Sequence, residues 1–280
     1  MYIAPNAVLS AFSIGKPTSV VIDLGASCTH ISAVHDGYEL KKSKLQTLRG
    51  GDWIDQQLHH VILKGGVRIK PSFDSNGENI LVAKSYRDMV VMDAVKDIKR
   101  WMSVVPPKGT PSSRQEYISN LQIPPYYLPD GTKVSYSEEI CTIPELLFSH
   151  PNEHRIVTNV QQYLNLDKNY RISLPKLVHE CLSRCDIDVR KDLTSSILVA
   201  GGGSLIEGIT SRLAEELNDA LPAAYKPKLA SPMAVERHYA AWIGGSILGI
   251  CGSFQQMWLS KLEFEEQGDR AVLQKFVERA

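Results

Sequence analysis

The sequence predicts an α/β protein with a largely buried sheet, and two strand-and-glycine patterns support this prediction. Near the amino end, the β-branched run at 19–23 has the composition of a buried strand; it ends in Asp23 and turns at Gly25. In the last third, the apolar strand at 195–200 is followed at once by Gly201-Gly202-Gly203 and then by a helical pattern. A strand, a glycine loop and a helix in succession are typical of α/β proteins.

The first part of the chain predicts a helix and a β-hairpin. Apolar spacing over residues 5–12 indicates a short helix that closes at Gly15. A second strand follows the first at 29–34, and Asp36-Gly37 marks another tight turn. Strands that fold back this quickly form a hairpin, because a βαβ unit needs a longer crossover.

The middle of the chain predicts two helices, an exposed loop and a second hairpin. Apolar residues recur at helical spacing over 51–65 and again over 85–101. The proline- and serine-rich segment 106–113 interrupts every periodic pattern, so we expect an exposed loop there. A proline-and-glycine turn at 128–131 joins two short strands, 126–128 and 133–136.

The carboxyl-terminal third predicts two helical regions. Ser204 and Glu207 have the spacing of a capping box, which satisfies the first free amides of a helix, and this helix is expected to continue to about Leu221. The second helical region spans 240–258 and contains the pair Gly244-Gly245.

Composition and charge exclude several classes of function. Lys+Arg and Asp+Glu both number 31, so the formal net charge is zero and there is no bulk electrostatic attraction to nucleic acid or an anionic membrane. Apolar stretches such as 242–250 fall far short of the roughly 20 residues that span a bilayer. We therefore expect no membrane contact and no direct sequence-specific nucleic-acid binding. The five cysteines show no CxxC spacing, which argues against zinc sites and disulfide scaffolds and favours free thiols: Cys28, Cys141, Cys181, Cys185 and Cys251.

Two glycine turns are candidates for phosphate binding. In 23–30, the amides of a turn between strands can form a concavity that fits a phosphate, and Asp23 can hold a hydrated divalent cation beside it. The alternative is a plain hairpin in which Asp23 caps its own turn.

The second candidate is the turn at Gly201–Gly203. Glycines there permit close backbone approach at a helix amino end, where the dipole favours anions. The alternative there is close packing of strand against helix. Taken together, the two turns indicate a cleft between two lobes that holds the phosphates and the nucleoside.

Several stretches resemble the actin superfamily, and the likeness covers essentially the whole chain. The stretches are 242–248 (WIGGSIL), 254–261 (FQQMWLSK) and 185–193 (CDIDVRKDL). Three others are most similar to class four of the nuclear actin-related proteins, the class shared by chromatin-remodelling and histone-acetyltransferase complexes: 23–27, 34–38 and 199–206.

The resemblance implies an actin-like ATPase fold, in which two lobes with a duplicated mixed sheet and flanking helices surround an ATP cleft. Members of the superfamily have an Asp-x-Gly phosphate hairpin and a further lobe before the segment that matches Met1, so half of the phosphate clamp has no counterpart and the sequence is expected to be N-terminally incomplete. An incomplete gene model is the first explanation, and a paralogue without nucleotide function and a short isoform are the alternatives. The implied division places 1–14 and 238–280 in a remnant of subdomain 1, 15–48 and 170–237 in subdomain 3, and 49–169, with a Pro/Ser-rich loop near 104–115, in subdomain 4.

The resemblance also implies two sites. The first binds ATP with Mg²⁺, and Asp23 interacts indirectly with the metal. Its residues are Asp23, Gly25, Ala26, Ser27, Cys28, Lys99, Gly201, Gly202, Gly203, Leu205 and His238. The second is a groove at the base of the lobes that receives a partner helix, with residues Phe12, Gly15, Leu248, Cys251, Ser253 and Met257. For Leu248 and Met257, packing at the lobe interface is the alternative.

The hydrolytic side of the implied ATP site departs from the actin pattern. Ala26 stands where actin has an acid that organises the catalytic water, and Asn6 stands where actin has a glutamine. His30 matches a histidine of the hydrolytic site, whereas Arg100 replaces a glutamate that holds the ribose. Because phosphoryl transfer chiefly requires a positioned water, we expect ATP to bind structurally with little or no turnover, and we expect no enzyme.

The implied function is that of a non-catalytic actin-related scaffold subunit of nuclear chromatin-remodelling and histone-acetyltransferase complexes. We expect nuclear localisation, docking beside actin on an amphipathic helix of a large subunit, and access to nucleosomes and histones through the complex. Two alternatives stay open. An ATPase or sugar-type kinase of the superfamily would need a catalytic base and a complete phosphate clamp, and a cytoskeletal filament protein would share the fold.

Overall fold

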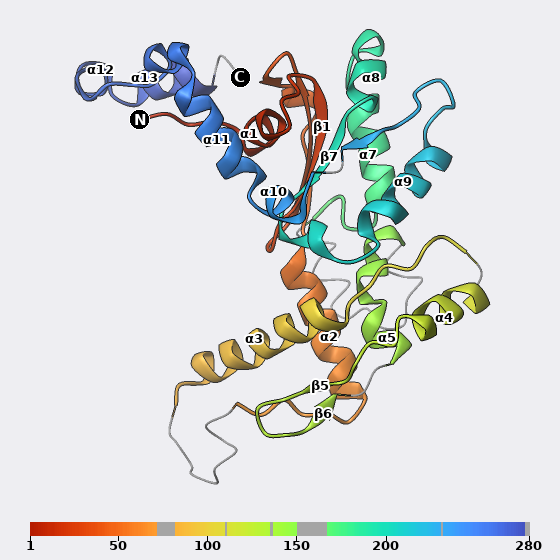
Figure 1. The fold of residues 1–280 in the computed structure, drawn as a ribbon. Coiled ribbons are helices and arrows are strands. Elements are labelled where there is room, and N and C mark those ends of the chain that lie inside the picture. Colours follow the sequence, from red (N-terminus) through yellow and green to blue (C-terminus); the bar gives the residue numbers. More distant parts are fainter. Residues whose placement is uncertain (72–81, 110, 135–136, 150–166, 231, 278–280) are drawn as a thin grey trace.

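The computed structural model describes residues 1–71, 82–109, 111–134, 137–149, 167–230 and 232–277 (Figure 1). An upper part is built on a β-sheet, a lower part is mainly helical, and α2 (Gly51–Lys64) leaves the sheet and runs into the lower part (Figure 1). One hydrophobic core continues through both parts, since Ile22, Leu58 and Ile98 all belong to it. Among the described helices, none is both long enough and apolar enough to cross a membrane.

The sheet of the upper part has six strands and mixed direction. In sheet order the strands are β3-β2-β1-β7-β8, with β4 also paired to β2. β1 runs antiparallel to β2 and parallel to β7, and β7 runs parallel to β8. The strands are β1 (Ser19–Leu24), β2 (Thr29–His35), β3 (Tyr38–Glu39), β4 (Leu45–Thr47), β7 (Ile197–Ala200) and β8 (Leu229–Ala230). The predicted hairpin and α/β class are therefore confirmed.

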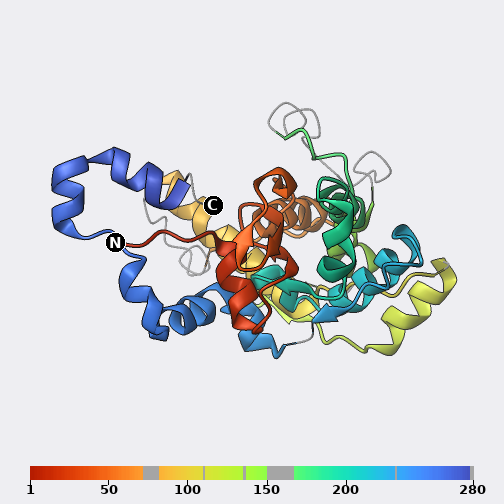
Figure 2. The same cartoon turned by 90° about the horizontal axis from the view of Figure 1, so that it is seen from above.

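Helices cover both faces of this sheet (Figures 1 and 2). On one face lie α1 (Asn6–Ser13) and α11 (Ala240–Ile250), and on the other lie α7 (Leu174–Ser183), α8 (Ile187–Thr194) and α9 (Ile209–Ala220). The strand alternation explains the division, because successive side chains point to opposite faces. Val21 packs with α1, whereas its neighbours Val20 and Ile22 belong to the main core.

Helices α1 and α11 cross at very short range, and a glycine makes this possible. A Cβ atom on Gly244 would lie 1.7 Å from the carbonyl oxygen of Leu9. No side chain fits in that space. Of the pair Gly244-Gly245, it is therefore Gly244 that the packing of α11 against α1 requires. This contact holds the carboxyl-terminal elements against the amino-terminal helix.

The lower part contains helices and a small hairpin. α2 packs against α3 (Lys84–Met102) and against a short helix, α5 (Glu138–Cys141), followed by the 3₁₀ helix η3 (Ile143–Phe148). The hairpin consists of β5 (Tyr126–Tyr127) and β6 (Lys133–Val134). It confirms the predicted turn at 128–131, while residues 135 and 136 of the predicted second strand lie outside the described residues.

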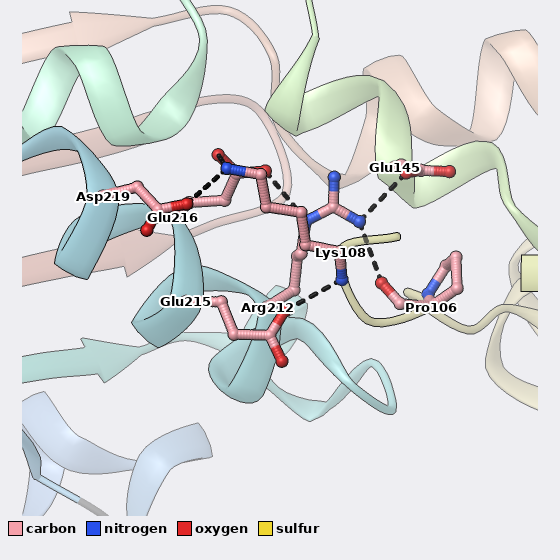
Figure 3. Close-up of polar contacts among 7 residues, drawn as sticks. All are labelled: Pro106, Lys108, Glu145, Arg212, Glu215, Glu216 and Asp219. Atoms are coloured by element: carbon pink, nitrogen blue, oxygen red, sulfur yellow. Dashed lines mark hydrogen bonds and ion pairs between the residues drawn. The ribbon is translucent and has the colours of Figure 1, made fainter. Parts of the chain in front are cut away.

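Residues 104–108, here called the strap, connect the lower part to α9 (Figure 3). The amide of Val105 donates to the carbonyl of Glu207 at 2.8 Å. Arg212 of α9, whose side chain is only 5% exposed, donates to the carbonyl of Pro106 at 2.9 Å and to Glu145 of η3 at 3.0 Å. Arg212 also donates to Glu216 at 2.9 Å. One buried guanidinium therefore joins the strap, η3 and α9.

The strap corrects the prediction of an exposed Pro/Ser-rich loop at 106–113 and near 104–115. Residues 104–106 are buried, and α4 (Pro111–Asn120) begins within the segment that was expected to be a loop. A proline at the first helical position needs no hydrogen-bond partner for nitrogen and already has a helical φ, so Pro111 starts a helix. Only residues 107–109 remain as an exposed loop, and residue 110 lies outside the described residues.

The predicted capping box at Ser204 and Glu207 is wrong. Ser204 lies in a 3₁₀ helix, η5 (Gly202–Leu205), and its hydroxyl donates to the carbonyl of Gly201 at 2.7 Å. Helix α9 begins at Ile209, five residues after Ser204, and Gly208 before it has a left-handed φ of +81°. A Cβ atom on Gly208 would lie 2.0 Å from the carbonyl oxygen of Val105, so the close approach of the strap requires this glycine.

The carboxyl-terminal elements extend away from the sheet and lie beside the amino terminus (Figures 1 and 2). The predicted helical region 240–258 is divided, because α11 ends at Ile250 and a 3₁₀ helix, η6 (Gly252–Gln256), follows. Beyond it come α12 (Lys261–Gln267), α13 (Asp269–Val272) and a π-helical turn (Leu273–Val277). The amide of Leu259 donates to the carbonyl of Met1 at 2.7 Å, which ties the segment before α12 to the amino end.

Candidate functional site

The turn between β1 and β2, residues 25–28, is anchored by its carbonyl groups and leaves its amides free. The carbonyls of Gly25 and Ala26 accept from the amides of Gly51 and Asp52 at 2.9 and 2.8 Å, at the amino end of α2. Within the described residues, no acceptor is found for the amides of Ala26, Ser27 and Cys28. Ala26 and Ser27 are exposed. Free amides in a turn of this kind can form a concavity that suits a phosphate group.

A second turn, at Gly201–Gly203, packs against Asp23 and Leu24 at the end of β1, immediately before the first turn. Gly201 has a φ of +85°, and a Cβ atom there would lie 2.5 Å from an Asp23 carboxylate oxygen. A Cβ on Gly203 would lie 2.8 Å from the Cβ of Leu24. These glycines let the two turns meet at the carboxyl ends of the parallel strands β1 and β7, which is where open α/β sheets bind ligands.

Asp23 is the acidic group at this junction. One carboxylate oxygen accepts a hydrogen bond from the side-chain nitrogen Nδ2 of Asn6, and the other faces Gly201. Among the described residues, no group of three or more metal-binding side chains exists. The carboxylate of Asp23 at the end of β1 offers oxygen atoms of the kind that hard divalent cations prefer.

His238 and Leu205 border the second turn. His238, at the end of α10 (Ala234–His238), has its ring carbon Cε1 3.5 Å from the position of a Cβ on Gly202. Its ring packs edge-on against Tyr239, with the ring centroids 4.4 Å apart. Leu205 is exposed at the end of η5. An exposed apolar side chain and an exposed ring beside backbone amides are groups that suit a nucleoside.

Lys99, near the end of α3, reaches the first turn from the lower part. Its ammonium lies 2.7 Å from Oδ1 of Asp55 and donates to the carbonyl of Gly51 at 3.1 Å. A Cβ on Gly51 would lie 3.4 Å from both the Lys99 Nζ and the Ala26 Cα, so the ammonium and the turn border one small space. Arg100, by contrast, pairs with Asp97 at 3.2 Å on the exposed side of α3.

The side of the turn that faces α1 carries His30 and Cys28. The sulfur of Cys28 lies 3.0 Å from Nε2 of His30, while Nδ1 of His30 is buried with no hydrogen-bond partner among the described residues. Burial, and secondarily the Asp23 carboxylate, raise the pKa of the Cys28 thiol above its ordinary value. A hollow of about 120 Å³ adjoins these groups, lined by Asn6, Ala7, Val21, Asp23, His30, Ser32, Glu39 and Lys44.

The residues predicted for the partner-helix groove lie along α1 and the α11–η6 segment. Phe12 packs on the small cluster of α1 and the sheet, and Gly15 follows α1 with a φ of +64°. Leu248 is 7% exposed and is a core residue, which agrees with the alternative that this side chain packs inside the protein and does not receive a partner helix. Cys251 and Ser253 are exposed and Met257 is half-buried, so these three keep surface that a partner could contact.

Two residues beside the turns were missed in the sequence, Asp55 and Gly50. Asp55 lies three residues before Leu58 on the apolar face of α2, and an acid in such a stripe is the signal that could have found it. A Cβ on Gly50 would lie 2.5 Å from the carbonyl oxygen of Ala26, so this glycine is what lets α2 begin against the turn. No local pattern reveals that contact.

A mixed sheet with flanking helices and two glycine turns meeting at its strand ends is the architecture of the actin-like ATPase fold. The family profile described as Actin matches residues 1–277, and the chain belongs to the actin family.

The chain is similar to three proteins of the same name. It is 34% identical to "Actin-related protein 4" of Arabidopsis thaliana over 98% of this chain and 64% of that protein. The protein of the same name from Oryza sativa subsp. japonica is 35% identical over 98% of this chain and 64% of its own length. That of Schizosaccharomyces pombe is 28% identical over 97% and 69%. The chain thus spans about 64% of the length of the plant relatives.

Proposed function

We propose that this protein is a non-catalytic actin-related scaffold subunit of nuclear chromatin-remodelling or histone-acetyltransferase complexes, and that it binds MgATP without hydrolysing it efficiently. The non-catalytic part rests on the side chains beside the first turn at the positions where actin has its hydrolytic residues. Ala26 has no acid to orient a water, and Nε2 of His30 faces the Cys28 sulfur at 3.0 Å. A water that no side chain orients is a poor nucleophile for phosphoryl transfer.

The nucleotide-binding part rests on the free amides and on the fit of the two turns. The amides of Ala26, Ser27 and Cys28 would hold phosphate oxygens, and Asp23 would face the hydrated Mg²⁺. Gly202, Leu205 and His238 would border the nucleoside. Bound Mg²⁺ would neutralise phosphate charge, and in this proposal the nucleotide strengthens the contact between the two turns.

Equilibrium binding and phosphate release, measured on the same preparation, test this part. The proposal predicts saturable binding of MgATP and no phosphate release above the buffer control, with conventional actin measured in parallel. Robust, saturable phosphate release by the purified protein would overturn the non-catalytic assignment. Absence of MgATP binding would overturn the nucleotide assignment.

The scaffold part rests on the resemblance to class-four proteins and on the exposed residues beside α11. Cys251, Ser253 and Met257 offer small and apolar surface of the kind that accepts an amphipathic helix. The proposed partners are actin and a helix of a large complex subunit, with nucleosomes and histones reached through the complex. Nuclear localisation follows from that assembly.

Affinity purification from nuclei tests the scaffold part. A tagged wild-type chain should recover actin and remodelling or acetyltransferase subunits. A Ser253→Arg variant should lose the large subunit, because a long charged side chain would block the groove. Ser183→Arg, at an exposed serine that is the last residue of α7, should keep it. Recovery of actin filaments alone, or equal recovery by both variants, would contradict the docking assignment.

A further inference from the structure

A segment that belongs to neither proposed site leads into the hairpin of the lower part and has the sequence Pro124-Pro125-Tyr126-Tyr127. Residues 122–125 form no helix or strand, and the two tyrosines form β5. Tyr127 is 62% exposed, and Pro124 is exposed as well. The segment therefore presents a proline and a tyrosine, three residues apart, to solvent.

The two prolines favour a polyproline II type of backbone in this segment. The ring of a proline holds φ at about −65°, and a residue that precedes a proline is disfavoured in the α region. Pro124 meets both conditions, because it is followed by Pro125, and Ile123 meets the second. A polyproline II helix has three residues per turn, so side chains three residues apart point to the same side.

The burial of the side chains follows this period of three. Ile123 and Tyr126, which are three residues apart, both pack against the main hydrophobic core. Pro124 and Tyr127, which are also three residues apart, are both exposed. One side of the segment is therefore fixed to the protein, and the opposite side carries the proline and the tyrosine that face solvent.

Contacts at both ends hold the segment in place. The indole nitrogen of Trp101, on α3, donates to the carbonyl oxygen of Pro124 at 3.3 Å. Trp101 is itself 58% exposed, so its ring adds apolar surface beside the proline. At the other end, β5 pairs with β6 in the hairpin. A segment that is already ordered loses little conformational entropy when it binds a partner, and this favours affinity.

We propose that residues 124–127 are a docking motif for a WW-type domain, which contacts Pro124 and Tyr127 on the exposed side of the segment. Domains that recognise polyproline II ligands bind them in grooves lined by aromatic rings. SH3-type grooves take a ligand with a second proline three residues after the first, and here Tyr127 occupies that position. A proline followed at this spacing by a tyrosine suits a WW domain, which has a separate pocket for the tyrosine ring. This role is independent of the proposed nucleotide site.

Fluorescence polarisation of a labelled WW domain that binds Pro-Pro-x-Tyr peptides, titrated with the intact chain, tests the proposal. The wild type should bind saturably. Tyr127→Ala and Pro124→Ala should each weaken binding at least about tenfold, because each removes one of the two side chains that the domain contacts. Tyr38→Ala is the matched control, since Tyr38 is a tyrosine of similar exposure (64%) on β3, and it should bind like the wild type. A labelled SH3 domain, titrated in parallel, should not bind.

Several results would overturn the proposal. The first is a wild-type chain that does not bind the WW domain, and the second is binding that Tyr127→Ala leaves unchanged. A synthetic peptide of residues 120–131 that binds while the intact chain does not would show that the fold hides the motif. Binding of the SH3 domain that Pro124→Ala abolishes would replace the WW assignment. Circular dichroism checks that each variant is folded, and if Tyr127→Ala is not, Pro124→Ala decides.

Discussion

Replacing Arg212 with methionine should destabilise the fold by about 3 kcal/mol. The reason is that the acceptors of the buried guanidinium lose their hydrogen-bond donor when the side chain is changed. Arg212 donates to the Pro106 carbonyl and to two carboxylates (Figure 3). Its guanidinium carbon also lies 5.5 Å from the centroid of the Phe148 ring. Removing one partner of a buried ion pair typically costs roughly 3–5 kcal/mol. Glu145 and Glu216 are 13% and 20% exposed, so water relieves part of that loss and the lower end of the range applies.

Urea unfolding at neutral pH, followed by circular dichroism, measures this effect. Arg212→Met/Glu145→Gln should recover part of the stability, since the negative charge that Arg212 neutralises at η3 is then removed as well. Asp219→Asn, at the exposed ion pair with Lys108, should leave the unfolding midpoint unchanged. A loss below about 1 kcal/mol in Arg212→Met would refute the reasoning that the strap is held to α9 by a buried charge network.

Three further predictions concern packing, pH and ligand protection. Gly244→Ala should lower stability by roughly 1–3 kcal/mol, measured by thermal unfolding, because its methyl would collide with the Leu9 carbonyl; an unchanged midpoint would show that α1 and α11 separate freely. Burial raises the pKa of Asp55, so the Asp55 carboxyl group stays protonated to a higher pH in the native state than in the unfolded chain. The stability contributed by Asp55 is therefore lost as pH rises, and the wild type should gain stability relative to Asp55→Asn as pH falls from 7 toward 4; the reverse trend in urea unfolding would contradict it. MgATP should slow iodoacetamide labelling of Cys28 and not of the exposed Cys251, as read by peptide mass spectrometry, and equal slowing would argue against a ligand at the turn.

The sequence predicted best what short-range physics decides. The β-branched run at β1, the turn residues at 36–37 and the apolar spacing of α2 each act within a few residues, and the structure has all three. The two glycine turns were also found, because glycine is required where backbone approaches backbone. Their meeting at Asp23 and Gly201 depends on the parallel pairing of β1 with β7, which the local pattern does not contain.

The errors and omissions came from contacts between distant residues. Ser204 and Glu207 match a capping box in spacing, but residues 202–205 form a 3₁₀ helix and α9 starts only after the left-handed Gly208, against which the strap packs. The strap itself looked like an exposed loop because its burial depends on Arg212, far along the chain. Asp55 was missed for the same reason, since its partner Lys99 is on another helix.

Single-turnover hydrolysis by the wild-type protein tests nucleotide binding without catalysis most directly. ATP labelled in its terminal phosphate is bound with Mg²⁺, free nucleotide is removed, and the bound fraction is analysed over hours. Nearly all of the retained label should be recovered as intact ATP, as the proposal that neither Ala26 nor His30 orients an attacking water requires. Conversion to ADP and phosphate at the rate of conventional actin run in parallel would contradict this, and so would failure to retain any ATP.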